Sequence, residues 1–276
     1  MSDFDLVKQL RDETGVSVME CKKALDSANN DYELAKQHLV EQGMAKADKK
    51  SDRLTKTGYI NSFLSGNKGA LLELRCETDF VSKHEDFQQL AKDLAEQVVN
   101  SGIVSKDDLL NEKFSKDEKF TVLEAIKNAI AKFGENMEIG EIVLYEVENG
   151  FVSSYIHTGG RVATLVSFET QDASGLDDLG LDIAMQIAAM QPKYLSREDI
   201  PAETIESMKE EYSEGIDESK PEDIKNKILE GRLAKKYEEI CLLDQKFIKD
   251  DSKTITQLLK ESGKDVVIKQ YIRLEA

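Results

Sequence analysis

The sequence predicts an α+β protein, and three observations lead to that class. Residues 58–80 recur at 150–172, and each copy has the alternating pattern of a β-hairpin followed by a helix. About the first 45 residues have the periodicity and glycine stops of three short helices. Late in the chain, two long charged stretches meet near Gly215, which is typical of an antiparallel helical hairpin. We therefore expect a three-helix module, two duplicated α+β core subdomains with antiparallel sheets, and a helical hairpin.

The ends of the first helices are marked by small and polar residues. A helix over 3–14 should stop at Gly15, which suits the left-handed position that follows a helix. Asn30 and Glu33 have the spacing of a capping box for the third helix, and Gly43 would close that helix. Three short helices with such stops resemble a ubiquitin-associated-like fold. A module of this size is marginally stable alone, so we expect it to pack on a partner.

The duplication has an offset of 92 residues and needs no gap. Residues 58–64 (Gly-Tyr-Ile-Asn-Ser-Phe-Leu) align with residues 150–156 (Gly-Phe-Val-Ser-Ser-Tyr-Ile). Apolar positions further along keep the same phase, as Leu74 and Val166 do. Two copies are too few for a solenoid, so we expect two packed subdomains.

These patterns divide the chain into three parts. Residues 1–54 would form the ubiquitin-associated-like module and its linker, 55–140 the first core subdomain, and 141–276 the second core subdomain with the helical hairpin at about 194–243. Between the two hairpins we expect helices over 106–112 and 117–133, and a strand over 141–148 that enters the second copy. Beyond the second copy the patterns predict helices over 196–210, 221–243 and 254–261 and a closing strand over 266–274.

The formal net charge of −17 argues against a general nucleic-acid binder, because phosphate contacts need clustered Lys and Arg. The charge is uneven: residues 196–223 hold 11 acidic and 3 basic side chains, a net charge of −8. One basic stretch, residues 46–56, carries four Lys and one Arg against two Asp. We interpret it as a solvated linker, with contact to an acidic partner as the alternative.

The sequence favours the cytoplasm. It contains no run of about 18 apolar residues, so no membrane span is expected. Its acidic start lacks the basic residues and apolar stretch of a signal peptide. Cys21, Cys76 and Cys241 are widely spaced, odd in number and without a Cys-x-x-Cys pair, so we expect small core residues in a reduced compartment.

An active site is not evident in the sequence. Cys76 and His84 could form a nucleophile and base, but a strand end and a turn separate them, and the second copy has Phe168 in place of Cys76. We expect His84 in the first turn of a helix capped by Ser82 and Glu85. A phosphate-binding glycine-rich loop with Lys-Ser/Thr is absent from the sequence. We therefore expect no catalytic residues, no metal site and no cofactor.

The segment Thr78-Asp79-Phe80-Val81 connects an apolar strand to a helix. In one interpretation the apolar pair is a hydrophobic staple, with Val81 against residues 86–87. The second copy has Gln-Asp-Ala at 171–173 in place of Asp-Phe-Val, so the apolar residues belong to one copy alone. This asymmetry favours a binding role for Phe80, because connections on rigid scaffolds often carry function.

Several motifs make the sequence similar to the elongation factor Ts family. They occur in family order across essentially the whole chain: residues 7–15 (Val-Lys-Gln-Leu-Arg-Asp-Glu-Thr-Gly), 21–25 (Cys-Lys-Lys-Ala-Leu), 76–81 (Cys-Glu-Thr-Asp-Phe-Val), 155–161 (Tyr-Ile-His-Thr-Gly-Gly-Arg), 230–233 (Glu-Gly-Arg-Leu) and 241–245 (Cys-Leu-Leu-Asp-Gln).

The resemblance implies a non-enzymatic translation elongation factor that promotes GDP release from elongation factor Tu, its protein partner. By position, Asp79 and Phe80 would enter that GTPase and disturb its Mg²⁺ site, with Thr78 and Val81 fixing the segment. Further partner contacts implied by the resemblance are Leu10, Arg11, Gly15, Cys21, Lys22, Lys23, His157 and Gly159.

Three points stay open. The acidic hairpin is a candidate surface for a homodimer. The sequence ends at Ala276, where some members of the family continue into a further helix, so contacts of that helix are not carried over. The main alternative function is a ubiquitin-associated-type adaptor with an unrelated α+β body, and an enzyme is a more distant one.

Overall fold

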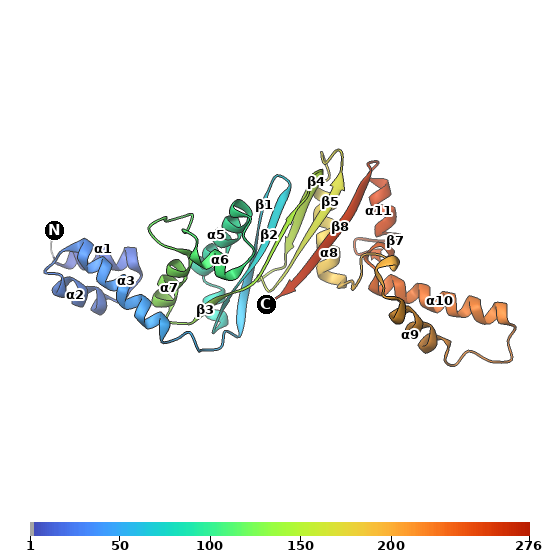
Figure 1. Ribbon diagram of the computed structural model, residues 1–276, viewed down its shortest axis with the longest axis horizontal. Helices are drawn as coiled ribbons and strands as arrows, with labels where there is room; N and C mark the ends of the chain where they lie inside the picture. The colour runs from blue at the N-terminus through green and yellow to red at the C-terminus, as the bar shows by residue number, and fades with distance from the viewer. Residues whose placement is uncertain (1–2) are drawn as a thin grey trace.

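The computed structural model describes residues 3–276, and its helices and antiparallel sheets confirm the α+β class. The molecule is elongated, with the N-terminal helices at one end, two sheets in the middle and a helical hairpin at the other end (Figure 1). Within the described residues, no helix is long and apolar enough to cross a membrane.

The N-terminal end consists of α1 (Asp3–Thr14), α2 (Val18–Ser27) and α3 (Tyr32–Asp48). Gly15 follows α1 with a φ of 67°, so the predicted stop is confirmed. The buried core of the three helices is formed by Leu10, Cys21, Ala24, Leu25, Ala28, Ala35 and Leu39.

The predicted ends of α3 were both wrong. Asp31, and not Asn30, is the N-cap, since its side chain accepts a hydrogen bond from the Leu34 amide, while Asn30 has a positive φ of 64°. Gly43 does not end the helix, which runs on to Asp48. A Cβ at Gly43 would lie 2.8 Å from the Cβ of Ala131, so this glycine lets α3 pack closely against a helix of the core.

The first sheet is antiparallel, in the order β1-β2-β3. Its strands are β1 (Thr57–Ser65), β2 (Lys68–Cys76) and β3 (Met137–Glu146). The sequence predicts a strand over 141–148 that enters the second copy. This prediction was wrong about the strand's place in the fold, because β3 pairs with β2 and completes the first sheet. A domain boundary at 140 would therefore fall inside a strand of the first sheet.

Helices cover the first sheet on the face turned away from the second sheet (Figure 1). They are α4 (Asp79–Ser82), α5 (Glu85–Ser101), α6 (Lys106–Asn111) and α7 (Val122–Phe133). The start of α7 differs from the prediction of 117, because Thr121 and Glu124 form its capping box. Ala47 of α3 lies in the same buried cluster as this sheet and its helices.

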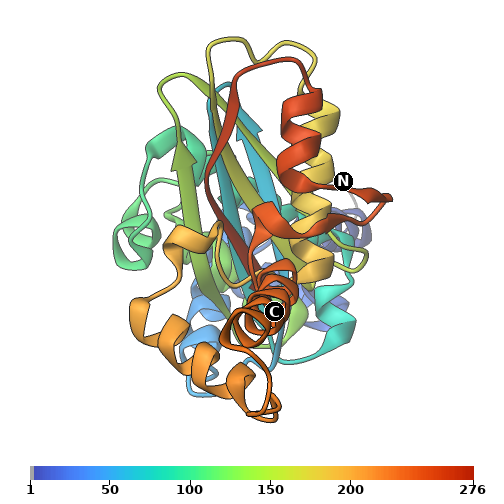
Figure 2. The same ribbon diagram turned by 90° about the vertical axis from the view of Figure 1, so that its right-hand side faces the viewer.

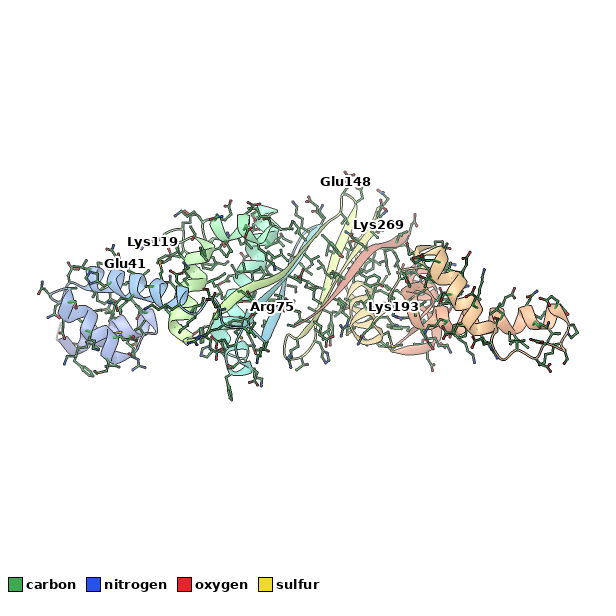
Figure 3. The ribbon with its side chains drawn as sticks, turned by 60° about the horizontal axis from the view of Figure 1, so that its bottom comes forward. Glu41, Arg75, Lys119, Glu148, Lys193 and Lys269 are labelled. Carbon is green, nitrogen blue, oxygen red and sulfur yellow. The ribbon has the colours of Figure 1, made fainter. Side chains whose placement is uncertain are left out.

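A bulge in the first sheet accommodates a buried carboxylate. The register between β2 and β3 shifts between Leu72 and Leu74, opposite Gly140 and Glu141. The intervening Glu73 is buried and accepts hydrogen bonds from Arg75 at 2.9 and 2.8 Å; Arg75 is labelled in Figure 3. The Glu141 amide also donates to Glu73, so the charge is satisfied.

The second sheet repeats this arrangement, in the order β4-β5-β8. Its strands are β4 (Gly150–Ile156), β5 (Val162–Thr170) and β8 (Val266–Glu275). Helices α8 (Asp177–Met190) and α11 (Ile255–Glu261) lie side by side on its outer face (Figures 1 and 2), and a short ribbon of β6 (Lys246–Phe247) and β7 (Asp250–Thr254) precedes α11. As in the first sheet, the third strand is the last element of its half.

The two sheets pack face to face through equivalent residues. Ile60 and Val152, which differ by the repeat offset of 92, lie in one buried cluster between the sheets. Ser154 Oγ donates to Ser62 Oγ at 3.0 Å, and these two positions are also 92 apart. Equivalent residues contact each other across a two-fold axis, so the duplication has produced a local pseudo-two-fold axis.

The helical hairpin consists of α9 (Ala202–Ser213) and α10 (Glu222–Ile240), with the short 3-10 turns η1 (Arg197–Asp199) and η2 (Leu242–Asp244) at its base. The prediction of a helix from 196 was wrong. Pro201 disfavours helical backbone at Ile200, so α9 begins only after this proline. The hairpin projects from the second sheet (Figures 1 and 2).

Candidate partner-binding site

Phe80 is the most exposed of the large apolar side chains in the described residues, with 84% of its surface accessible. It lies on α4, the four-residue helix that leads from β2 to α5. Its neighbour Val81 is only 8% exposed and belongs to the same core cluster as Phe87. The staple role therefore belongs to Val81, and Phe80 is free to contact another molecule.

Hydrogen bonds fix the backbone around Phe80. The Cys76 thiol donates to the Thr78 carbonyl at 3.2 Å, and Ser82 Oγ donates to the Asp79 carbonyl at 3.1 Å. Both carboxylate oxygens of Glu135 accept hydrogen bonds from Thr78, one from its amide and one from its hydroxyl. We refer to residues 78–81 as the tip segment.

Asp79 is exposed and forms an ion pair with Lys83 at 2.6 Å, one helical turn away. The hydrogen bond from Lys83 lowers the pKa of the Asp79 carboxyl, and the charge of Arg161 adds a smaller effect. Arg161 comes from the second copy, so the 155–161 motif contributes to the electrostatics of the tip segment. Backbone contact also joins this motif to the first sheet, since the Ile60 amide of β1 donates to the Gly160 carbonyl at 2.7 Å.

His157 and Gly159 lie in the turn between β4 and β5. The Tyr155 hydroxyl and His157 Nδ1 are 3.0 Å apart, and the Gly160 amide donates to the His157 carbonyl. Gly159 has a φ of 91°, a backbone conformation that residues other than glycine rarely adopt. Both residues are exposed, so this turn presents a fixed polar surface next to the first copy.

The N-terminal candidates fall into two groups. Leu10 and Cys21 are fully buried in the three-helix core, so they support the module and offer no surface to a partner. The other four, Arg11, Gly15, Lys22 and Lys23, are exposed.

Sequence reasoning did not single out Val18 and Met19, which are 50% and 66% exposed beside these cations. Their position off the buried stripe of α2, which carries Cys21, Ala24 and Leu25, is a signal that could have identified them.

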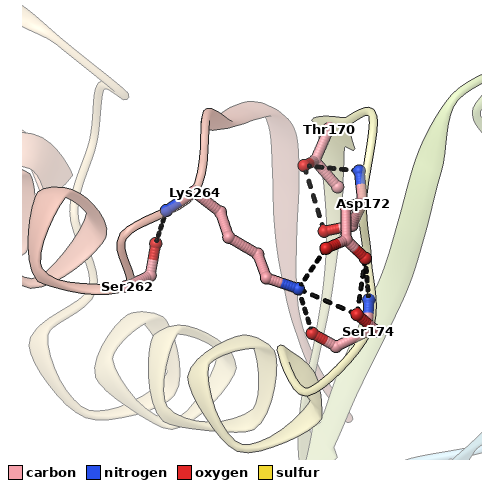
Figure 4. A network of polar contacts seen from close by, with 5 residues as sticks. All are labelled: Thr170, Asp172, Ser174, Ser262 and Lys264. Carbon is pink, nitrogen blue, oxygen red and sulfur yellow. Dashed lines mark hydrogen bonds and ion pairs between the residues drawn. The ribbon is translucent and has the colours of Figure 1, made fainter.

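The second copy has a different structure where the first has its tip segment. Thr170, the equivalent of Thr78, accepts a hydrogen bond from the Asp172 amide, and Lys264 binds Asp172 at 2.8 Å and also contacts Ser174 (Figure 4). The hydrogen bond from Lys264 lowers the pKa of Asp172 well below its usual range. A polar loop held by Lys264 thus replaces the short helix, so only the first copy presents an exposed aromatic side chain here.

The Cys76–His84 alternative is not supported by the geometry. Cys76 is fully buried, and desolvation raises the pKa of its thiol to about 12, whereas a nucleophile needs the thiolate. His84 is itself the N-cap of α5, correcting the expected cap at Ser82, and its Nδ1 accepts from the Asp86 amide. Its ring packs edge-on against Phe133.

All three cysteines are buried and free, as expected. In the described part of the chain, His, Cys, Asp and Glu form no group arranged to hold a metal ion.

Comparison with known proteins gives a consistent result. Residues 77–276 match the family model described as Elongation factor TS. The chain is 40% identical over 277 residues to Elongation factor Ts of Clostridium botulinum (strain Alaska E43 / Type E3), covering 98% of this chain and 91% of the relative. It is 41% identical over 277 residues to Elongation factor Ts of Clostridium perfringens (strain SM101 / Type A), with the same coverage.

Proposed function

The chain belongs to the elongation factor Ts family, and on that premise we propose that it promotes GDP release from elongation factor Tu by disturbing the Mg²⁺ and phosphate site of that GTPase. Family membership makes it a translation elongation factor that acts in guanine-nucleotide exchange. The observation that carries the mechanism is the exposed Phe80 on a short helix whose backbone is fixed on both sides.

An exposed aromatic side chain can favour one conformation of a partner over another. Phe80 is almost fully hydrated in the free protein, so burying it in an opened GTPase would contribute about 2 kcal/mol. A closed GTPase without a cavity for the ring would gain nothing from it. Such differential binding shifts the partner toward the opened state, and this requires no chemistry from the chain itself.

The Mg²⁺ ion is an effective point of attack because it bridges phosphate oxygens and neutralises their charge. Asp79 is adjacent to Phe80 and carries a negative charge at neutral pH, as an exposed carboxyl does, and Lys83 lowers its pKa further. When the tip segment enters the GTPase, this carboxylate would be brought along with the ring. We propose that Asp79 and Phe80 act together on the residues that hold the ion.

The remaining candidates are proposed to hold the GTPase in place. Arg11, Lys22 and Lys23 would contact it from the N-terminal helices, and His157 and Gly159 from the second copy. The elongated shape separates the N-terminal helices from the second sheet, so contacts on both sides of the tip segment can orient it (Figure 1). Residues far from the tip would then provide affinity, while the tip segment provides exchange.

The decisive experiment measures release of labelled GDP from elongation factor Tu with catalytic amounts of this protein. We expect release to accelerate many-fold, and incubation of the protein with GTP alone to yield no phosphate. Binding without acceleration would favour an adaptor instead. Phosphate release that co-purifies with the chain and needs no partner would indicate an enzyme.

A further inference from the structure

The turn between α7 and β3 holds the tip segment from outside its own hairpin. Gly134 closes α7 in the left-handed conformation, and Glu135 follows it. Glu135 Oε1 accepts from the Thr78 hydroxyl at 2.6 Å, and Oε2 accepts from the Thr78 amide at 2.9 Å. Hydrogen bonds to a carboxylate are about twice as strong as neutral ones, so this two-point contact fixes the first residue of the tip segment.

The contact is unusual because Thr78 is the N-cap of α4. A threonine in that position normally turns its hydroxyl oxygen toward the amides of the first helical turn. Here the Thr78 side chain makes no capping hydrogen bond and donates to Glu135 instead. A helix of four residues has little stability of its own, so its orientation depends on such external contacts.

The same turn also binds the chain that leaves the N-terminal helices. Asn136 is buried, and its Nδ2 donates to the carbonyls of Ser51 at 3.2 Å and Arg53 at 2.8 Å. The Asn136 amide donates to Glu77 Oε1 at 2.6 Å, and Arg53 reaches the same oxygen at 3.4 Å. Residues 134–136 therefore connect the linker after α3 to the residues directly before Phe80.

Helix α7 extends this connection to the N-terminal helices themselves. Its Ala131 packs against Gly43 of α3, and its Lys127 pairs with Asp48 at the end of α3 at 2.7 Å. One helix thus contacts α3 along its side and carries Glu135 just beyond its C-terminal end. A partner bound to the N-terminal helices would meet the tip segment in a defined position.

We propose that Glu135 is a positioning residue for exchange, which fixes the direction of Phe80 through its two hydrogen bonds to Thr78. This inference rests on the proposed function of the tip segment. Without Glu135, Thr78 at the start of α4 would no longer be held in place in the free protein. Its backbone would then have to be ordered when Phe80 enters the GTPase, and ordering one residue costs about 1–2 kcal/mol of conformational entropy. The loss would appear in the rate at which the bound GTPase opens and releases GDP. The initial binding would change little, because other surfaces provide it.

The test compares Glu135→Ala with the unaltered full-length protein in GDP release from elongation factor Tu. Release rates are measured over a range of concentrations, so that the maximal rate and the half-saturating concentration are separated. We expect the maximal rate to fall about tenfold, with little change in the half-saturating concentration. The tenfold figure corresponds to the entropy cost of ordering one residue during insertion. Glu135→Gln should restore most of the rate, because its amide oxygen can accept from the Thr78 amide and its NH2 group can donate to the Thr78 hydroxyl oxygen, which keeps both contacts.

Glu96→Ala is the matched control. Glu96 also lies in the first core subdomain and forms a surface ion pair with Lys116 at 2.7 Å, but it has no contact with the tip segment. We expect this variant to exchange normally. Thermal melts of each variant identify losses that come from unfolding, and if Glu135→Ala does not fold, Thr78→Val removes one of the same two hydrogen bonds.

A double-mutant cycle with Phe80→Ala separates positioning from general support. If Glu135 acts through Phe80, Glu135→Ala should change little once the ring is gone. An equal loss in both backgrounds, or normal exchange by a folded Glu135→Ala protein, would overturn the inference and leave the proposed function intact. Normal exchange by Phe80→Ala alone would overturn the proposed function and this inference with it.

Discussion

At the scale of single residues, the main feature is the opposite environment of two neighbours. Phe80 is exposed and Val81 is buried in the core of the first subdomain, although the two are adjacent on α4. An exposed phenylalanine stabilises the free protein little, because its ring remains in water. Its side chain is therefore available to bind a partner, whereas Val81 serves the fold.

We predict that Phe80→Ala mainly slows GDP release, whereas Val81→Ala mainly lowers the free energy of unfolding. Phe80→Ala should change the free energy of unfolding by less than about 1 kcal/mol, as surface substitutions do. It should slow GDP release on the order of tenfold or more, since the opened GTPase loses about 2 kcal/mol of burial. Val81→Ala should lower stability by about 2 kcal/mol through lost core packing. Denaturant melts and GDP-release traces on both variants provide the comparison.

A large loss of stability in Phe80→Ala, with normal exchange by the folded fraction, would show that the ring belongs to the core. Asp79→Ala should act in the same direction as Phe80→Ala. The two substitutions should be non-additive, because both residues enter the GTPase in one event.

At the scale of elements, close approach between helices decides how the N-terminal end is attached. Helix α3 continues past Gly43 because tight packing on α7 outweighs the modest helix penalty of a glycine, about 1 kcal/mol. The last turns of α3 thereby join the buried cluster of the first core subdomain through Ala47. The N-terminal helices have their own core, but one of them is shared with the rest of the molecule.

This contact predicts a compensating pair of substitutions. Gly43→Ala should lower stability by about 1–3 kcal/mol through overpacking against Ala131, less the gain of about 1 kcal/mol in helix propensity. Ala131→Gly alone should cost about 1 kcal/mol. The double variant restores the total volume, so its melting temperature should exceed the value expected from adding the single effects. Strict additivity would mean that α3 and α7 separate easily.

The acidic hairpin offers a second prediction at this scale. Residues 213–228 lie beyond the cluster of Met208 and Leu233, against which Tyr212 and Leu229 still pack, so replacing 213–228 with a short glycine-containing turn should leave the base folded. Because the hairpin lies beyond the second sheet, at the end away from the first sheet that carries the tip segment, exchange should stay close to normal (Figure 1). Light scattering on the same variant tests whether the hairpin mediates a homodimer. An exchange defect as large as that of Phe80→Ala would place the hairpin in the exchange surface.

At the scale of the whole molecule, the duplication creates two halves with one fold and different surfaces. The sheets meet through equivalent positions such as Ser62 and Ser154, which gives a rigid centre. The first half carries the exposed Phe80, while the second half replaces it with a loop held by Lys264. One copy can therefore act on a partner while the other provides a fixed surface beside it.

Exchange by differential binding predicts a reciprocal relation. The factor by which this protein weakens the binding of GDP to elongation factor Tu must equal the factor by which GDP weakens its own binding. We expect factors of about 5 to 150, the usual range of coupling between two sites. Equilibrium titrations with and without saturating GDP measure both. If GDP leaves the affinity for this protein unchanged, the chain does not distinguish the opened GTPase and the proposed mechanism fails.

The sequence by itself determined most of the elements and their duplication. Gly15 and Gly134 end helices, alternating apolar residues predict β1 and β8, and the offset of 92 residues identifies two halves. These features could be predicted because caps, glycine stops and strand alternation reflect preferences of the backbone within a few residues. The unusual composition of the tip segment was also visible, since only one copy carries the aromatic residue.

Only the tertiary structure decided which elements meet and which side chains remain in water. The pairing of β3 with β2, the extension of α3 past Gly43, and the contact of Glu135 with Thr78 all depend on residues far apart in the chain. Local patterns carry no record of such partners. The exposure of Phe80 beside the buried Val81 is likewise set by the orientation of α4 on the core. Both residues are apolar, so the sequence alone does not tell which one faces inward, and the packing of the surrounding helices decides it.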